Sequence, residues 1–136
     1  MQVKDLMSTD LVTVTPQDTV ASAAKLMSQY NIGALPVVTD QNLCGILTDR
    51  DIVTRCLAQG DTATACKVGD IMSASAACVM PGQALDDAIH LMSKEQVRRL
   101  PVLDNGKLAG MISLADIARS RATSETAEAL SEISMP

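Results

Sequence analysis

The chain of 136 residues is almost without aromatic side chains, because it has no Phe, no Trp and a single tyrosine, Tyr30. Apolar residues still make up 47% of it, so the core must be built from Leu, Ile, Val, Ala and the eight Met. Methionine fills irregular gaps without fixing one packing arrangement, and we therefore expect a pliable core. A body of this length buries roughly two thirds of its unfolded surface and needs no metal or disulfide to hold it together.

The chain also lacks an excess of basic residues. Its net charge is −5 and its pI is about 4.6, which argues against nucleic acids and anionic membranes as partners, since both attract positive fields. The negative charge is distributed unevenly along the chain, because residues 1–65 carry four basic and seven acidic groups, whereas residues 66–120 carry six of each. The second half of the chain is therefore the more favourable place for a small anion such as a phosphate.

Membrane and export signals are missing as well. No apolar run approaches the roughly 20 residues of a membrane-spanning helix, and the first residues show neither the basic start nor the apolar run of a signal peptide. The cysteines are scattered and form no CxxC pair: Cys44, Cys56, Cys66 and Cys78. We therefore expect a cytoplasmic protein with reduced thiols, most of them buried as small apolar side chains.

Signals of catalysis are also absent. The single histidine, His90, is expected on the polar flank of a helix, and there is no nucleophile elbow, P-loop or cluster of metal ligands. Asp86 and Asp87 fit the role of first-turn partners of a helix dipole better than that of paired catalytic acids. The sequence thus predicts a protein that is not an enzyme, with no metal site and no required cofactor.

What the chain does contain is a duplication. Residues 1–55 align with residues 66–120 at a constant shift of 65 without any gap, and 17 of the 55 pairs are identical. The clearest shared runs are Leu26-Met27-Ser28 with Leu91-Met92-Ser93, and Leu35-Pro36-Val37 with Leu100-Pro101-Val102. We predict repeat 1 over residues 1–60, a linker over 61–65, repeat 2 over 66–121, and a C-terminal tail over 122–136 that is either mobile or a short amphipathic helix.

Hydrophobic periodicity predicts the same element order in each repeat: strand, helix, strand, strand, helix. The expected elements are strands 12–14 and 78–80, helices that start at Asp18 and Gln83, hairpins 34–47 and 100–112, and helices 49–57 and 114–121. Apolar stripes along the first helices comprise Val20, Ala23, Ala24 and Met27, and Leu85, Ala88, Ile89 and Met92. Asn105-Gly106 is a strong hairpin signal. The fold class is therefore α/β (α+β), and because a unit of about 55 residues is marginal alone, the two sheets are expected to pack together as a pseudo-twofold pair.

One motif stands at the same place in both repeats, GILTDRD at residues 45–51 and GMISLAD at residues 110–116. Thr48 and Ser113 fall where a strand ends and a helix starts, with Asp51 and Asp116 three residues later. These hydroxyls and carboxylates either only cap the helices, or also hold a nucleotide, with the helix start binding a phosphate and the carboxylate accepting hydrogen bonds from ribose hydroxyls. The glycine that opens each motif allows another backbone or a flat base to approach closely.

The ordered set of motifs resembles a tandem pair of cystathionine β-synthase (CBS) domains, also called a Bateman module. The set consists of a DLM-like start, a helix that ends in LMS, the LPV strand and the G-h-h-[ST]-x-x-D motif, and it covers residues 3–119. The resemblance implies two β-sheets packed face to face, with two clefts that often bind AMP, ADP, ATP, S-adenosylmethionine or dinucleotides. It also implies a regulatory role toward an attached or partner protein, and a flat homodimer.

The resemblance assigns the ligand residues. Asp51 and Asp116 are expected to take ribose hydroxyls, and Thr48 and Ser113 to lie near ribose and phosphate. Members often carry a basic residue just before LPV, which here implicates Arg98 and Arg99 in phosphate contact or, alternatively, in a solvated strand edge or a salt bridge. Arg50 has the same two alternatives, phosphate contact or an ion pair. Candidates for the walls of the adenine pocket are Val14, Val79, Pro36, Pro101, Ile46 and Met111.

We therefore expect a stand-alone sensor module that binds an adenosine-containing ligand and signals to an effector protein as a homodimer. Repeat 1 has Gly33-Ala34 where repeat 2 has Arg98-Arg99, so the two sites are not expected to be equivalent. The alternative is a dimeric stress or scaffold protein that binds no ligand. In that case the two motifs would serve only as helix caps.

Overall fold

The computed structural model describes residues 1–74 and 77–120, and they form two compact units. One unit consists of residues 12–76, and the other combines residues 1–11 with residues 77–136. The first eleven residues of repeat 1 therefore pack with the body of repeat 2, and the equivalent segment of repeat 2 packs with the body of repeat 1. The repeats visible in the sequence and the compact units of the structure thus differ by an exchange of leading segments.

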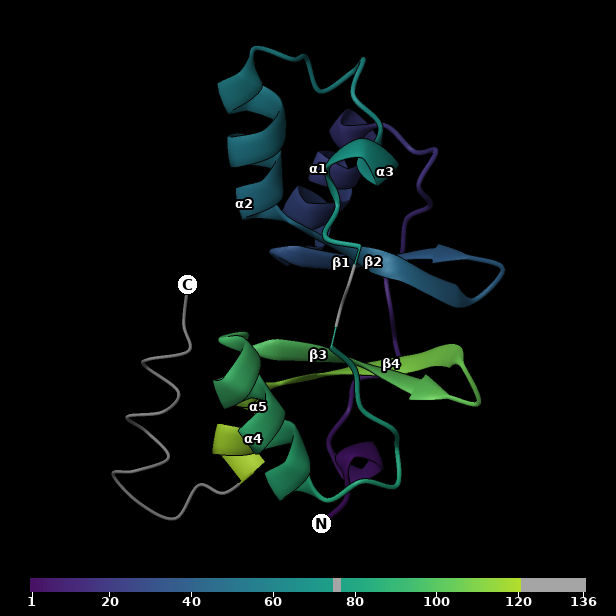
Figure 1. Ribbon diagram of the computed structural model, residues 1–136, viewed down its shortest axis with the longest axis vertical. Coiled ribbons are helices and arrows are strands. Elements are labelled where there is room, and N and C mark those ends of the chain that lie inside the picture. Colours follow the sequence, from purple (N-terminus) through teal and green to yellow (C-terminus); the bar gives the residue numbers. More distant parts are fainter. Residues whose placement is uncertain (75–76, 121–136) are drawn as a thin grey trace. The chain divides into compact units, whose positions relative to one another are not determined.

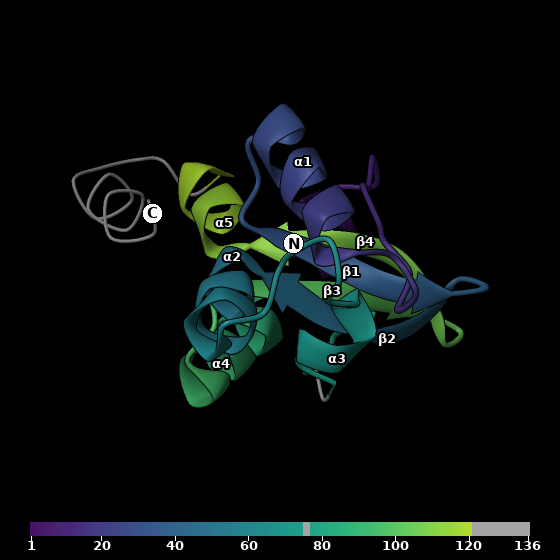
Figure 2. The ribbon, with the colours of Figure 1, turned by 90° about the horizontal axis from the view of Figure 1, so that it is seen from above.

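The unit of residues 12–76, called here the middle unit, is built on one hairpin. Its elements are α1 (Val20–Tyr30), β1 (Ala34–Thr39), β2 (Asn42–Thr48), α2 (Asp49–Asp51), the π-helical turn η2 (Ile52–Cys56), the 3-10 turn η3 (Leu57–Gln59) and α3 (Val68–Ile71). The antiparallel pairing of β1 with β2 runs from Ala34↔Thr48 to Thr39↔Asn42. In Figure 1 all the helices of this unit lie on one side of the hairpin, and Figure 2 shows them from above.

The second unit, called here the composite unit, repeats this plan. It contains η1 (Val3–Asp5), α4 (Leu85–Glu95), β3 (Arg99–Asp104), β4 (Lys107–Ser113) and α5 (Leu114–Ser120). β3 pairs with β4 from Arg99↔Ser113 to Asp104↔Lys107, and α4 and α5 lie on one side of this hairpin (Figure 1). The mixed α and β class, the two repeats and the two hairpins predicted from the sequence are confirmed. The tail over residues 122–136 and the last residue of the predicted helix 114–121 lie outside the described residues.

Each unit has its own aliphatic core. The expected stripes are confirmed, since Val20, Ala23 and Met27 of α1 and Leu85, Ala88 and Met92 of α4 are buried, with Ala24 and Ile89 packed beside them. The leading segments supply further core residues, because Val68 and Ile71 are buried in the middle unit and Val3 in the composite unit. Each unit therefore depends on an apolar contribution from the other repeat.

The first helices start two residues later than predicted, at Val20 and Leu85 rather than at Asp18 and Gln83. Both predicted start residues are engaged in turns instead: the Asp18 carboxylate accepts from the Thr15 N–H at 2.8 Å, and the Gln83 amide oxygen accepts from the Met80 N–H at 2.7 Å. The true N-cap of α1 is Thr19, whose hydroxyl accepts from the Ser22 N–H at 3.1 Å.

The predicted strands 12–14 and 78–80 are wrong as strands, because each is reduced to a single parallel bridge, Val14↔Val37 and Val79↔Val102. The Val14 N–H donates to the Pro36 carbonyl at 3.1 Å and the Val38 N–H donates to the Val14 carbonyl at 2.8 Å. A longer ladder would need an N–H at Pro36, which proline lacks.

Both hairpin turns are two-residue turns in which the two central residues have positive φ. In β3–β4 these are Asn105 at 51° and Gly106 at 80°, as the sequence predicts. In β1–β2 they are Asp40 at 51° and Gln41 at 70°. Glutamine, which does not favour the left-handed region, therefore occupies the position that Gly106 has in the other turn.

Candidate functional site

The glycine of each repeated motif makes room for backbone. The leading segment of the other repeat pairs with the edge of β2 or β4 that faces away from its hairpin partner, and Ile46 exchanges two backbone hydrogen bonds with Ser73, at 3.1 and 2.9 Å. A Cβ on Gly45 would collide with the Ser73 carbonyl oxygen, and one on Gly110 would lie 2.8 Å from the Ser8 carbonyl oxygen. Of the two alternatives for these glycines, the structure shows the close approach of a second backbone segment.

The sequence-predicted candidates of the middle unit share one face of its hairpin. Leu35, Val37 and Leu47 point toward the helices and are fully buried. Because side chains alternate along a strand and residues in register stand side by side, Ala34, Pro36, Ile46 and Thr48 lie together on the opposite face. This set, with Asp51, is called here the middle-unit site.

The composite-unit site consists of Arg99, Pro101, Met111, Ser113 and Asp116, and its arrangement is equivalent. Arg99 is the register partner of Ser113, so the β-carbons of the two residues are neighbours across the strands. Arg99 is exposed, whereas its counterpart in the middle unit is Ala34. The only cation that repeat 1 was expected to offer in its motif, Arg50, is likewise exposed, and its backbone N–H donates to the Asp49 carboxylate at 2.8 Å.

In the middle unit the motif forms a complete capping box. The Asp51 N–H donates to the Thr48 hydroxyl at 3.1 Å, and the Thr48 N–H donates to the Asp51 carboxylate at 3.0 Å. The second carboxylate oxygen of Asp51 lies 3.8 Å from Nε of Arg55, and its side chain is only 11% exposed. The capping role predicted for this motif is therefore confirmed, and the carboxylate of Asp51 is largely occupied within its own unit.

In the composite unit the same motif leaves the carboxylate more accessible. The Asp116 N–H donates to the Ser113 hydroxyl at 3.1 Å, so the cap is present here as well. The Asp116 carboxylate pairs with Arg119 at 2.5 Å, and its side chain is 35% exposed. An incoming donor can reach this carboxylate from solvent.

The two arginines that pair with the motif aspartates were missed by the sequence analysis. Arg55 follows Asp51 by four residues and Arg119 follows Asp116 by three, so the two pairs do not correspond in the repeat alignment. The i to i+3 and i to i+4 spacing was a signal that could have revealed them. Arg55 also donates to the Ile71 carbonyl at 3.2 Å and thereby joins the motif to the leading segment of repeat 2.

The positions before the LPV strands differ in charge. The Asp49 N–H donates to the Gly33 carbonyl at 2.9 Å, and a Cβ on Gly33 would lie 3.1 Å from the Asp49 carboxylate. In the composite unit Arg98 and Leu114 take these places and make the same backbone bond, at 2.8 Å. Asp49 thus corresponds to the apolar Leu114, and Gly33 to Arg98, so this pair of positions carries a negative charge in the middle unit and a positive charge in the composite unit.

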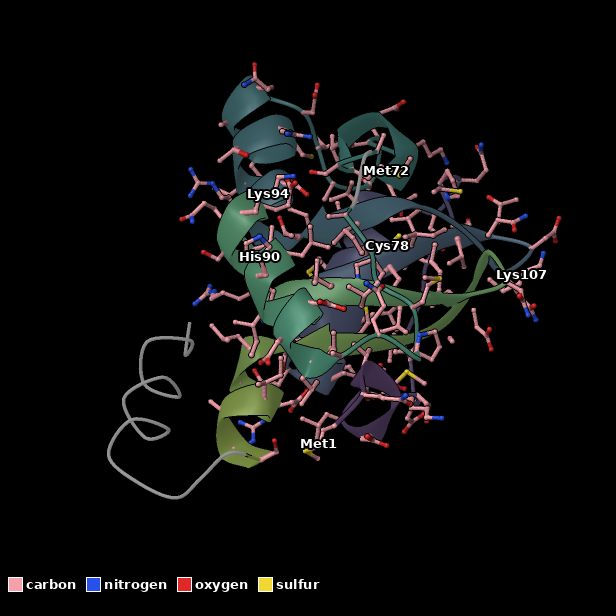
Figure 3. The ribbon with its side chains drawn as sticks, turned by 60° about the horizontal axis from the view of Figure 1, so that its bottom comes forward. Met1, Met72, Cys78, His90, Lys94 and Lys107 are labelled. Carbon is pink, nitrogen blue, oxygen red and sulfur yellow. The ribbon has the colours of Figure 1, made fainter. Side chains whose placement is uncertain are left out.

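The remaining candidates lie outside these two sites. Val14 and Val79 are each 2% exposed and belong to the cores of their units, where their backbones border Pro36 and Pro101. His90 is exposed on the outer side of α4 beside Lys94, as predicted (Figure 3).

Over residues 1–74 and 77–120, no group of three His, Cys, Asp or Glu side chains is arranged to hold a metal ion. No helix in the same part of the chain is long and apolar enough to cross a membrane.

The cysteines are less buried than predicted. Cys56 is fully buried, Cys44 and Cys66 are partly exposed, and Cys78 is exposed. The prediction that most of them are buried is therefore wrong. Their places in the fold explain the exposure. Cys44 lies near a hairpin turn and Cys66 follows a loop. Cys78 precedes the buried Val79 in an extended segment whose side chains alternate between the core and the solvent.

Comparison with known proteins supports the similarity inferred from the motifs. The model of the CBS domain matches residues 3–58 and 68–123. The CBS domain-containing protein YhcV of Bacillus subtilis is 44% identical over 133 residues, which cover 97% of this chain and 94% of that protein. The solved structure of CBSX2 in complex with AMP is 30% identical, has a TM-score of 0.77, and is matched over 88% of this chain and 94% of that one.

A further solved structure is the CBS domain pair of protein MJ0100 in complex with 5′-methylthioadenosine and S-adenosyl-L-methionine. It is 29% identical, has a TM-score of 0.79, and is matched over 88% of this chain and 94% of that one. The compounds bound in these two structures share an adenosine group.

Proposed function

Because the chain belongs to the CBS domain family, we propose that it is a regulatory module that binds an adenosine-containing ligand and changes its interaction with a partner protein in response. The relatives crystallised with AMP and with S-adenosyl-L-methionine support a ligand of this class. The observation that carries the proposal is the composite-unit site, where an exposed arginine, a capping hydroxyl and an accessible carboxylate stand together at the start of α5.

Each group of this site has a role that follows from its chemistry. The Asp116 carboxylate accepts hydrogen bonds from the two ribose hydroxyls, and Ser113 lies between ribose and phosphate. Arg99 makes a charge-assisted bond to the phosphate, and Pro101 and Met111 offer an apolar surface to the base. The ribose hydroxyls then replace or share the Arg119 contact of Asp116.

The two sites differ in how well they suit a phosphate. The middle unit places Ala34 where Arg99 stands and Asp49 where Leu114 stands, and its motif carboxylate is shielded by Thr48 and Arg55. Repulsion between carboxylate and phosphate opposes binding there. We therefore propose that the composite-unit site fills first with a phosphorylated adenosine.

Calorimetry with AMP and with adenosine tests this proposal. In Arg99→Ala we expect AMP affinity to fall by about tenfold to a hundredfold, or roughly 1.4–2.8 kcal/mol, while adenosine affinity hardly changes. Ala34→Arg is the matched gain-of-function variant and should strengthen AMP binding at the middle-unit site. Equal losses for AMP and adenosine in Arg99→Ala would show that Arg99 does not contact the phosphate.

A scaffold that binds no ligand is the competing function, and it has support in the structure because both motifs do cap their helices. A thermal shift assay separates the two functions. A ligand at 100 times its Kd adds about 2.7 kcal/mol to the free energy of unfolding. If AMP, ATP, NAD and S-adenosylmethionine all leave the melting temperature unchanged, the scaffold function is favoured.

A further inference from the structure

Two cysteines of the middle unit stand at the two ends of one loop. Cys56 closes the π-helical turn η2, and Cys66 lies ten residues later, just before α3. Cys56 belongs to the buried core of the unit, and Cys66 packs against the same core while remaining partly exposed. One thiol is therefore enclosed by protein, and the other can be reached by a small molecule.

The backbone fixes both cysteines in place. The Asp61 N–H donates to the Cys56 carbonyl at 3.1 Å, and the Cys66 N–H donates to the Thr62 carbonyl at 3.0 Å. The Cys66 carbonyl in turn accepts from the Val20 N–H at 2.9 Å and so caps α1. The two cysteines are thus tied to neighbouring loop residues, Asp61 and Thr62, and both side chains pack in the same core cluster.

The two thiols interact with each other. The pKa of the Cys66 thiol is raised by burial, then by its contact with the Cys56 thiol, and then by the negative charges of Asp61 and Asp70. A raised pKa keeps the thiol protonated near neutral pH. Since the thiolate is the reactive form, the reduced pair is stable under mild conditions, and its oxidation becomes faster as the pH rises.

We infer that Cys56 and Cys66 are a redox pair that a hydroperoxide converts into an intramolecular disulfide. The partly exposed Cys66 thiol loses its proton, and the thiolate attacks the O–O bond of the peroxide and forms a sulfenic acid. The leaving alkoxide or hydroxide takes up the proton that the thiol released. The Cys56 sulfur then attacks the Cys66 sulfur and forms the S–S bond, and the hydroxide that leaves takes up the Cys56 proton as water. The peroxide is the two-electron oxidant, and a dithiol reverses the reaction.

The other two cysteines have different surroundings and serve as internal controls. The Cys44 sulfur lies 3.3 Å from the Thr39 hydroxyl and 3.8 Å from the Asn42 carbonyl. Cys78 belongs to the composite unit, is exposed, and is labelled in Figure 3. The double variant Cys44→Ser/Cys78→Ser therefore leaves only the proposed pair.

Peptide mapping of the full chain tests the inference directly. Trypsin cleaves after Arg55 and after Lys67, so Cys56 and Cys66 fall in one peptide, residues 56–67, which contains no other cysteine. After treatment of the double variant with hydrogen peroxide and then iodoacetamide, we expect this peptide to be unalkylated. Its mass should be lower than that of the reduced, unalkylated peptide by two hydrogens. Prior reduction should restore two alkylations. A peptide that is alkylated twice after peroxide treatment, or that carries sulfinic or sulfonic acid, would overturn the inference.

Stability gives a second measurement. A disulfide that closes a loop of this length restricts the unfolded chain, and we expect the melting temperature of the oxidised double variant to exceed that of the reduced one by about 5–15 °C. Cys66→Ser at the partly exposed position should fold and show no such rise, which separates the disulfide from other effects of peroxide. An equal rise in Cys66→Ser would contradict the role of Cys66.

Discussion

At the scale of single residues, the two motif aspartates show how one pattern serves two purposes. Both stand three residues after a capping hydroxyl, and both meet an arginine one turn later. Asp51 bonds back to the Thr48 backbone and is nearly enclosed, whereas Asp116 keeps about a third of its side chain open to solvent. We expect substitution of Asp51 to affect stability and substitution of Asp116 to affect binding.

The first prediction compares Asp116→Ala with Asp51→Ala. Hydrogen bonds to a charged group contribute about 1.5–3 kcal/mol, so Asp116→Ala should weaken AMP binding roughly tenfold to a hundredfold with little loss of stability. Asp51→Ala removes half of a capping box and should lower the free energy of unfolding by about 0.5–2 kcal/mol. Titration calorimetry and urea denaturation of both variants measure the two effects. Unchanged AMP affinity in Asp116→Ala would leave this aspartate as a cap only.

At the scale of elements, the hairpins were predictable from sequence because their signals are local: alternation along the strands and the Asn105-Gly106 turn. The start of α1 was not predictable in this way. The Asp18 side chain could accept a hydrogen bond either as a helix N-cap or within a turn, and the structure shows that it closes a turn. The π-helical turn over Ile52–Cys56 also has no local signature in the sequence. The register that places Arg99 beside Ser113 did not follow from the turn length alone, because the pairing shifts by one residue between Val102 and Leu103.

The second prediction uses the two turns as a matched pair. Gln41 has φ of 70° at the position where the equivalent turn has Gly106 at 80°. Gln41→Gly should raise the free energy of unfolding by about 0.5–1 kcal/mol, because glycine adopts this conformation without steric cost. Gly106→Ala should lower it by a similar amount for backbone reasons alone, since nothing lies within 4 Å of an added Cβ. Denaturation midpoints that do not move in opposite directions would contradict this account.

The third prediction concerns the helical segment after Asp51. Ile52 is buried there, but Val53 and Leu57 are 56% and 53% exposed one turn apart. A depression lined by Asp49, Arg50, Val53 and Thr54 adjoins them. We propose this face as the homodimer contact, in which Arg50 of one copy can meet Asp49 of the other.

Light scattering at micromolar concentration tests the dimer. Val53→Asp should shift the protein toward the monomer, because it places a carboxylate in an apolar contact. Val97→Asp, at an exposed apolar residue of the composite unit, is the control and should leave the assembly unchanged. A wild-type protein that is strictly monomeric would refute the proposed contact.

At the scale of the whole molecule, the main feature is the exchange of leading segments between repeats. The duplication at a shift of 65 was visible in the sequence, but the exchange was not. Val3 and Val68 align with each other and carry the same apolar pattern, so either could have packed within its own repeat. Only long-range contacts decide the partner, and these leave no local periodicity.

The fourth prediction follows from this exchange. A fragment of residues 12–76 contains a complete core, including Val68 and Ile71, whereas a fragment of residues 1–60 lacks both and carries Val3 without its partners. Circular dichroism should show cooperative thermal unfolding for the fragment 12–76 and none for a monomeric fragment 1–60. Equal cooperativity in monomers of both fragments would mean that the exchanged segments contribute little to folding.

The exchange also imposes an order of folding during protein synthesis. The middle unit is one continuous stretch, so it can close as soon as residue 76 has left the ribosome. Ser8, in contrast, pairs with Met111, and Val3 packs with Val79 and Leu85, so residues made before the middle unit find their partners only after it. At about 5–20 residues per second, the hundred residues between Ser8 and Met111 take roughly 5–20 s to synthesise. For that interval Val3, Leu6 and Met7 form an uncovered apolar stretch on the nascent chain, and this is the place where we expect a ribosome-associated chaperone to bind.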